Sequence, residues 1–195
     1  MTTISLPRAA RRTAALAMRH KVVTGSIAVF VAALIAVSIL TGGTATTPSG
    51  TTEPLIGTVA PGFTLTALGK PGQHVSLSQY QGKPLIINFW ASWCAPCQQE
   101  TPLLASWYKQ QHGHVVLLGL DENDTTANAL KFVHAKGVTY PVGFDPNLTV
   151  PGAYGVDGLP QTFFLNAQHQ IVDHVLGAVT KAELAKGVRL MKSVS

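Results

Sequence analysis

Two nearly continuous apolar runs, Leu85–Trp90 and Val115–Leu120, stand out from the mixed pattern of the second half of the chain. Such runs are typical of strands that are buried on both faces of a parallel sheet. Between the two runs, apolar residues recur at the spacing of an amphipathic helix. These helical positions are Leu103, Leu104, Trp107 and Tyr108. The pattern therefore predicts a strand, a helix and a second strand in this order.

The segments on either side of this unit carry shorter patterns. Gly57–Tyr80 alternates short apolar pieces with turns, which predicts a small β-hairpin before the main fold. After the second buried strand, Asp124 can cap a helix with apolar positions at Leu130 and Val133. Gly137 is the residue type that commonly closes such a helix.

The last part of the chain predicts two strands and a helix. Thr162–Leu165 and Ile171–Leu176 are apolar runs, and the turn residues Gln168 and His169 between them indicate antiparallel pairing. Thr180 is expected to begin a helix whose inward positions are Leu184, Val188 and Leu190. Together these elements predict an α/β sandwich.

The first 54 residues have a different character. Val22–Leu40 is a run of nineteen residues without a charge, close to the ~20 that a helix needs to cross a bilayer. The basic tail 1–21 before it indicates a cytoplasmic N-terminus, with the rest of the chain outside the cytoplasm. We expect a retained signal-anchor at 22–40, followed by a flexible linker over 41–54 and one domain over 55–195. The alternative is a signal peptide cleaved near Gly43–Ala45, which would release a secreted form.

Charge is concentrated in the tail. Of the fourteen Lys and Arg residues, five precede Val22, and the nine that follow are matched by nine Asp and Glu. A nucleic-acid-binding protein would cluster basic charge on its folded body, and no such cluster is visible, so no nucleic-acid partner is expected. The balanced charge of the body gives no electrostatic indication of its partner.

The only two cysteines of the chain, Cys94 and Cys97, lie between the first predicted strand and the helix that follows it. A CxxC pair at this junction predicts a redox-active dithiol in a compartment where disulfides persist. Zinc would require two further ligands at suitable spacing, and none is present, so no metal or other cofactor is expected. The residue directly after Cys97 is Gln98 and not His, which excludes a CxxCH haem-attachment site.

Several separated motifs in this order resemble the thioredoxin superfamily, and within it the TlpA/ResA-like branch of membrane-anchored extracytoplasmic thioredoxins, related to the AhpC/TSA redoxins. The resemblance spans the chain from about Gly57 to the end. The motifs are Ala60–Leu65, Gly82–Pro84, Asn88–Cys97, Glu100–Leu103 and Gly155–Phe163. The resemblance implies a thioredoxin-like three-layer sandwich with an N-terminal β-hairpin extension, preceded by one transmembrane helix.

The resemblance also implies roles around the cysteines. At a helix N-terminus, Cys94 would have a lowered pKa and attack as a thiolate, and Cys97 would resolve the mixed disulfide. Pro160 resembles the cis-proline that faces the dithiol in this superfamily, which would turn the Leu159 backbone toward a bound peptide. Trp93 is expected in the surface around Cys94, and Pro96 fits the first turn of the helix.

Two carboxylates and an amide are informative in this context. Ordinary thioredoxins carry a buried acid at the position of Asn88, so the proton acceptor for the resolving cysteine must be absent or elsewhere. Glu122 resembles the active-site glutamate of the ResA-like branch and would relay the proton if it lay partly buried near Cys97. The opposing interpretation is a solvated loop carboxylate. Glu100 matches a family position on the helix, or is a surface residue.

The function implied is an extracytoplasmic thiol–disulfide oxidoreductase that reduces protein disulfides, with apocytochrome c as the family's best-known substrate. A membrane electron carrier of the CcdA/DsbD type would recharge it. An oxidant that introduces disulfides with the same residues is the main alternative. A thiol peroxidase is disfavoured because Ala91 stands where a Thr or Ser would precede the peroxidatic cysteine. A tethered binding or chaperone module is the alternative that is not an enzyme.

Overall fold

The computed structural model describes residues 55–193, and within them a seven-stranded mixed sheet forms the centre of the molecule. Its strand order is β2-β1-β5-β4-β3-β6-β7. The three central strands, β3 (Leu85–Trp90), β4 (Val116–Glu122) and β5 (Val142–Asp145), run parallel. Helices α2 (Ala95–Gln110) and α3 (Thr126–Lys136) supply the crossovers that parallel neighbours require.

Antiparallel strands complete both edges of the sheet. On one side, β6 (Gln161–Leu165) pairs with β3, and β7 (Ile171–Leu176) pairs with β6. On the other side, the predicted hairpin forms β1 (Thr64–Ala67) and β2 (His74–Ser76), and β1 joins the main sheet through β5. The hairpin is therefore an extension of the central sheet.

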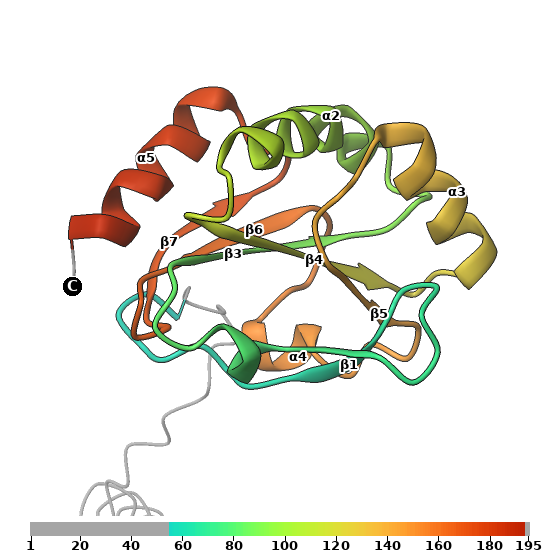
Figure 1. Cartoon of the computed structure of the whole chain (residues 1–195), viewed down its shortest axis with the longest axis horizontal. Helices are drawn as coiled ribbons and strands as arrows, with labels where there is room; N and C mark the ends of the chain where they lie inside the picture. The colour runs from blue at the N-terminus through green and yellow to red at the C-terminus, as the bar shows by residue number, and fades with distance from the viewer. Residues whose placement is uncertain (1–54, 194–195) are drawn as a thin grey trace, which may run out of the picture. The chain divides into compact units, whose positions relative to one another are not determined.

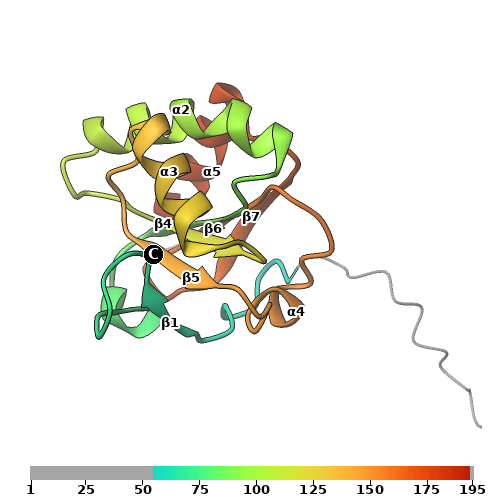
Figure 2. The same ribbon diagram turned by 90° about the vertical axis from the view of Figure 1, so that its right-hand side faces the viewer.

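Apolar residues cover both faces of the sheet. Helices α2, α3 and α5 (Lys181–Ser193) lie on one face, and the short α4 (Pro151–Tyr154) lies on the other, as Figures 1 and 2 show. Strand β3 is buried along its whole length because it alternates between the two cores. Ile86 belongs to the cluster under the three helices, whereas Leu85 and Ile87 belong to the cluster that contains Tyr154 of α4. The predicted α/β sandwich of thioredoxin type is confirmed.

The predicted N-cap of α3 at Asp124 and the predicted inward position of Leu190 in α5 are wrong. The N-cap of α3 is Thr125, whose hydroxyl accepts a hydrogen bond from the Asn128 N–H at 3.3 Å. Asp124 does not cap this helix, because one of its carboxylate oxygens accepts from the Ser92 N–H at 2.8 Å and the other from the Thr125 N–H at 2.7 Å.

In α5, the residues that are buried against the sheet are Leu184, Gly187 and Met191, and Leu190 is only half-buried. The predicted end of α3 at Gly137 is confirmed, with this glycine in the left-handed conformation (φ 67°).

The predicted tail, signal-anchor and linker, residues 1–54, lie outside the described residues. Within residues 55–193, no helix combines the length and the apolar character that a bilayer crossing needs.

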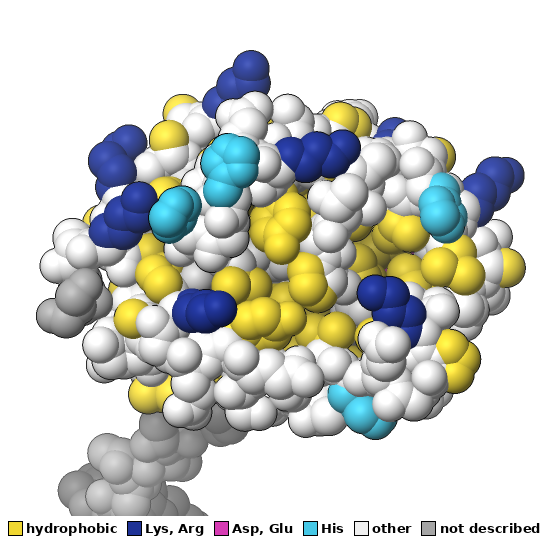
Figure 3. All heavy atoms as spheres, in the orientation of Figure 1, with side chains coloured by type: hydrophobic (Ala, Val, Ile, Leu, Met, Phe, Trp, Pro, Cys, Tyr) yellow, Lys and Arg dark blue, Asp and Glu magenta, His cyan; other side chains and the backbone are white. Residues whose placement is uncertain are grey.

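Charged side chains are divided unevenly between interior and surface. Eight Asp and Glu and nine Lys and Arg lie between residues 55 and 193. Four of these acids are buried, namely Glu100, Asp121, Glu122 and Asp145, whereas all the basic residues are exposed except the half-buried Lys136. The face seen in Figure 3 shows Lys, Arg and His side chains around a hydrophobic hollow, and no Asp or Glu. The balanced formal charge of the body therefore does not describe its surface.

The packing of α5 on β6 gives a first prediction. A Cβ on Gly187 would lie 2.3 Å from Cδ1 of Phe164, a ring that is fully buried. Gly187→Ala should therefore lower the free energy of unfolding by about 1–3 kcal/mol, although alanine favours a helix over glycine by about 1 kcal/mol. Urea denaturation measures the difference.

Gly152→Ala, in α4, is the matched control, because nothing lies within 4 Å of its added Cβ. We expect this variant to be as stable as the parent chain. Equal stability of Gly187→Ala and the parent would contradict the close contact between α5 and β6.

Candidate active site

Strand β3 and helix α2 bring the two cysteines to one edge of the sheet. β3 ends at Trp90, the chain turns, and the Cys94 N–H donates to the Ala91 carbonyl at 3.2 Å. Cys94 is the N-cap of α2, and Pro96 lies in the first turn. The N–H groups of this turn have no acceptor within the helix, so proline, which lacks an N–H, loses no hydrogen bond there. The local sequence thus ends a buried strand and starts a helix within a few residues.

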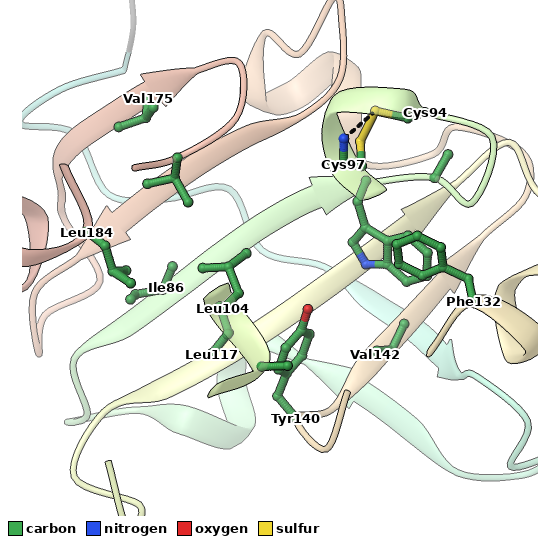
Figure 4. Close-up of a cluster of buried hydrophobic side chains, with 14 of the residues drawn as sticks. Ile86, Cys94, Cys97, Leu104, Leu117, Phe132, Tyr140, Val142, Val175 and Leu184 are labelled. Atoms are coloured by element: carbon green, nitrogen blue, oxygen red, sulfur yellow. Dashed lines mark hydrogen bonds between the residues drawn. A yellow bond between two sulfur atoms is a disulfide. The ribbon is translucent and has the colours of Figure 1, made fainter. Parts of the chain in front are cut away.

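Cys94 and Cys97 form a disulfide with an S–S distance of 1.98 Å, so the structure has the oxidised form of the pair (Figure 4). Cys94 is 4% exposed and Cys97 is fully buried. The Cys97 N–H donates to Cys94 Sγ at 3.2 Å, which makes this sulfur the capping atom of the helix. In the reduced pair, the same N–H and the helix dipole would stabilise a thiolate at Cys94. The two cysteines therefore differ in environment, since Cys94 caps the helix and keeps slight exposure, whereas Cys97 is fully buried.

A groove of about 390 Å³ opens beside the disulfide. We call it the Trp93 groove, and its lining includes Trp93, Glu122, Leu148, Asp157 and Leu159. Trp93 is 59% exposed, and its indole N–H donates to the Asn123 carbonyl at 3.0 Å. Exposed apolar side chains next to a reactive sulfur suit the binding of an extended peptide.

Three of the seven predicted site residues, Trp93, Glu122 and Leu159, line this groove. The Leu159–Pro160 peptide bond is cis, as the family resemblance implied, and Leu159 lines the groove while Pro160 is buried. Pro96 is exposed at the start of α2 and is not part of the lining. Trp90 is core: it is 1% exposed, and its ring stacks on Phe132.

Glu100 is the site residue whose importance the sequence left undecided. It is 3% exposed, one turn after Cys97 on α2. Its Oε1 accepts from Asn88 Nδ2 at 2.8 Å, and its Oε2 accepts from the Val179 N–H at 2.6 Å. Asn88 Nδ2 also donates to Thr162 Oγ1 at 3.0 Å. Glu100 is therefore a buried acid held by two hydrogen-bond donors, Asn88 and the Val179 N–H, and not a surface residue.

Burial raises the pKa of Glu100 to about 7, and its hydrogen bonds from Val179 and Asn88 oppose this rise. A group with this pKa can gain or lose a proton near neutral pH. The sequence contained an indication of its burial. Glu100, Thr101 and Leu104 recur at helical spacing on the buried side of α2, so the pattern indicates that this glutamate faces inward.

Asp121 and Glu122, at the end of β4, lie on opposite faces of the sheet because successive side chains of a strand alternate. In this strand Leu117 packs in the core under α2 and α3, whereas Leu118 and Leu120 pack in the core that contains Tyr154. By this alternation Asp121 shares the face of the cysteines, and Glu122 points to the other face. The structure therefore does not bring Glu122 to Cys97's side of the sheet.

Both carboxyls are buried and poorly partnered. Asp121 is fully buried, neither of its oxygens has a hydrogen-bond partner, and burial, followed by repulsion from Asp124 and Glu122, raises its pKa to about 8. Glu122 is 4% exposed, its Oε1 is unpartnered, and burial together with the neighbouring Asp145 raises its pKa to about 8. Glu122 is thus not a solvated loop carboxylate, and Asp121 is a buried acid that the sequence pattern did not single out.

No group of three or more His, Cys, Asp or Glu side chains within residues 55–193 is arranged to hold a metal ion.

Comparison with known proteins places this geometry in a family. The model of the AhpC/TSA family matches residues 56–174. The thiol-disulfide oxidoreductase ResA of Bacillus thuringiensis (strain Al Hakam) is 34% identical over 130 residues, which cover 66% of this chain and 74% of that protein. ResA of Bacillus subtilis (strain 168) is 33% identical over 139 residues, covering 70% and 75%.

Solved structures agree. A DsbF homologue from Corynebacterium diphtheriae is similar with a TM-score of 0.62 and 27% identity, covering 67% of this chain and 85% of that one. A secreted Mycobacterium tuberculosis disulfide oxidoreductase homologous to Escherichia coli DsbE has a TM-score of 0.59 and 25% identity, covering 65% and 94%. The chain belongs to the AhpC/TSA family and, with its Cys94–Cys97 pair, is an enzyme of the thiol–disulfide oxidoreductase class.

Proposed function

We propose that this protein is an extracytoplasmic reductant of protein disulfides, with Cys94 as nucleophile and Cys97 as resolving thiol. The observation that carries the proposal is the position of Cys94 as N-cap of α2, with its sulfur accepting the Cys97 N–H. The Trp93 groove beside it would bind the substrate segment that carries the target disulfide, with Leu159 next to the cis-proline as a backbone contact.

The reaction transfers two electrons from the dithiol to the substrate. The Cys94 thiolate attacks one sulfur of the substrate disulfide, which forms a mixed disulfide and releases the first substrate thiolate. Cys97 then loses its proton and attacks Cys94 Sγ. The Cys94–Cys97 disulfide forms, the mixed disulfide breaks, and the second substrate sulfur leaves as a thiolate that takes up a proton.

We assign the proton acceptor for Cys97 to Glu100 and not to Glu122. Residues three apart on a helix share a face, so Glu100 follows Cys97 on the buried side of α2. Asn88, at the position where ordinary thioredoxins have the acid, instead donates to the Glu100 carboxylate. The carboxylate that accepts the proton of Cys97 would thus come from helix α2, and not from strand β3 as in ordinary thioredoxins. Glu122 would act in the Trp93 groove, where its protonated carboxyl can donate to a bound peptide.

The electrostatics of the site support reduction over oxidation. A dithiol becomes strongly oxidising when its thiolate form is highly stabilised, as by neighbouring cations. Here the residues between the cysteines are Ala95 and Pro96, and the Trp93 groove is lined by two acids, Glu122 and Asp157, and by no Lys, Arg or His. The thiolate of Cys94 would gain stabilisation chiefly from the helix N-terminus.

The location and partners belong to the same proposal. The apolar run Val22–Leu40 would anchor the protein in the cell membrane, with the thioredoxin-like domain outside the cytoplasm. A membrane electron carrier of the CcdA/DsbD type would return the disulfide to the dithiol. Relatives named ResA and the DsbE homologue support a protein substrate, for which oxidised apocytochrome c is our candidate.

Substitution of each cysteine tests the assigned roles. Cys97→Ser should accumulate a covalent mixed disulfide with an oxidised peptide substrate, because the second attack is lost. Cys94→Ser should form none and lose disulfide reduction entirely. Non-reducing gel electrophoresis or intact mass separates these outcomes. A mixed disulfide that accumulates on Cys94→Ser and not on Cys97→Ser would reverse the assignment.

The reduction potential of the pair tests the direction of electron flow. We expect a value near that of thioredoxin, about −270 mV, in equilibrium with glutathione or dithiothreitol buffers. A value near that of DsbA, about −120 mV, would contradict the reductant and favour a protein that introduces disulfides.

The pH dependence of resolution tests Glu100. An ionised carboxylate is required to accept a proton, and the pKa of Glu100 is raised to about 7. The rate of the second step should therefore rise as the pH increases through about 7, and Glu100→Gln should remove this inflection and slow the step by about 10²-fold. Stopped-flow fluorescence of the exposed Trp93 can follow the reaction.

Glu122→Gln is the matched control, since Glu122 is an equally buried glutamate near the same edge of the sheet. It should retain the inflection near pH 7. Loss of the inflection in Glu122→Gln, with Glu100→Gln unchanged, would return the proton-acceptor role to Glu122.

A further inference from the structure

A second hollow lies away from the cysteines, between helix α3 and the β1–β2 hairpin. Its volume is about 620 Å³, and we call it the α3 groove. Apolar side chains of both elements and of the start of β5 line it, among them Leu68, Leu130, Val133, Val138 and Val142. Leu130, Val133 and Val138 are only half-buried, so part of their apolar surface remains open to solvent.

Positive charge borders this groove. Lys70 and His74, from the hairpin, are part of its lining, which contains no Asp or Glu. Lys109 of α2 is not part of the lining, but its Nζ would lie 3.7 Å from a Cβ on Gly137, the residue before Val138 of the lining. Among the described residues, neither Lys70 nor Lys109 forms an ion pair with a carboxylate, in contrast to Lys186, which pairs with Asp173. Figure 3 shows the hydrophobic hollow and its basic border on one face.

The imbalance of charge on this face follows from the burial of acids elsewhere. Glu100, Asp121, Glu122 and Asp145 are withdrawn from the surface, whereas the lysines remain exposed. An apolar centre with a charged rim is the usual anatomy of a protein interface. Its single sign of charge indicates that the complementary surface is acidic.

We propose that the α3 groove is a docking site for an acidic amphipathic segment of a partner protein. The apolar side of such a segment would occupy the hollow, and its Asp and Glu side chains would meet Lys70, His74 and Lys109. This surface is separate from the Trp93 groove, so the partner could remain bound while the cysteines react.

The shape of the face disfavours an anionic bilayer as the occupant. Surfaces that bind membranes present protruding apolar side chains that enter the headgroup region. The exposed large apolar residues of the described chain lie elsewhere: Ile56, Val59, Trp93, Leu148 and Leu176. None of them lines the α3 groove, where the apolar surface is recessed.

The test uses two fluorescent 18-residue helical peptides with the same leucine face and with either glutamate or lysine on the other face. Binding to the full-length chain is followed by fluorescence anisotropy at low and high salt. The glutamate peptide should bind, more weakly at high salt because screening reduces the attraction, and the lysine peptide should not. Lys70→Glu combined with Lys109→Glu should weaken binding about tenfold or more.

Two further variants locate the contact. Thr139→Trp, at an exposed residue of the lining, should obstruct the hollow and also weaken binding. Lys181→Glu, an exposed lysine at the start of α5, is the control for charge reversal and should bind as the parent does. Cys94→Ser should also bind normally, so failure of the redox proposal would leave this measurement unchanged.

Three results would overturn the proposal. The two peptides bind equally, or the variants at Lys70, Lys109 and Thr139 bind as the parent does, or the glutamate peptide does not bind. In the last case, sedimentation with phosphatidylglycerol vesicles that depends on Lys70 would assign the face to a membrane surface.

Discussion

The hydrogen bond between Asn88 and Glu100 connects the parts of the structure on which the site depends. Through Asn88, the carboxylate of Glu100 is tied to β3, and through the bond from Asn88 to Thr162 it is linked to β6. Its second oxygen accepts from Val179, just before α5. One buried carboxyl therefore joins the helix that bears the cysteines to two strands and to the last helix. Hydrogen bonds to a charged group contribute about 1.5–3 kcal/mol each, so these contacts offset part of the cost of burying the acid.

The burial of acidic side chains determines both their pKa values and the charge that remains on the surface. Removing Glu100, Asp121 and Glu122 from water raises the pKa of each, to about 7, 8 and 8, because desolvation penalises the charged form. At neutral pH these residues are proton carriers more than fixed charges. The folded domain consequently has fewer negative charges than its composition indicates, and exposed lysines dominate the face in Figure 3.

The sequence predicted the sheet, the position of the cysteines and the cis-proline because each depends on local patterns or on an ordered motif. It did not single out the acid to which we assign the proton of Cys97. Periodicity places Glu100 on a helix face, but only the tertiary contacts with Asn88 and Val179 show that this face is closed over the carboxylate. The face of the sheet on which Glu122 lies depends on the register of β4. Its neighbour Asp121 and not Glu122 faces α2, and a shift of one residue in a strand exchanges the two faces. The N-cap of α3 also depends on a tertiary contact. Asp124 is a residue type that often caps helices, but in the fold its carboxylate accepts a hydrogen bond from the Ser92 N–H.

The two grooves divide recognition between surfaces of different character. The Trp93 groove is small, lies next to the sulfurs and carries acids, so it suits a transient contact with a peptide that must leave once it is reduced. The α3 groove is larger, apolar and basic, and it is formed by elements that do not contribute to the disulfide. An enzyme whose substrate contact must be brief gains specificity from a second, more persistent contact, since linked binding raises the effective concentration of the target at the sulfurs. Tyr140 lines the α3 groove, and burial, followed by the charge of Glu100, raises the pKa of its hydroxyl, so the floor of this groove lies within electrostatic reach of the acid to which we assign the proton of Cys97.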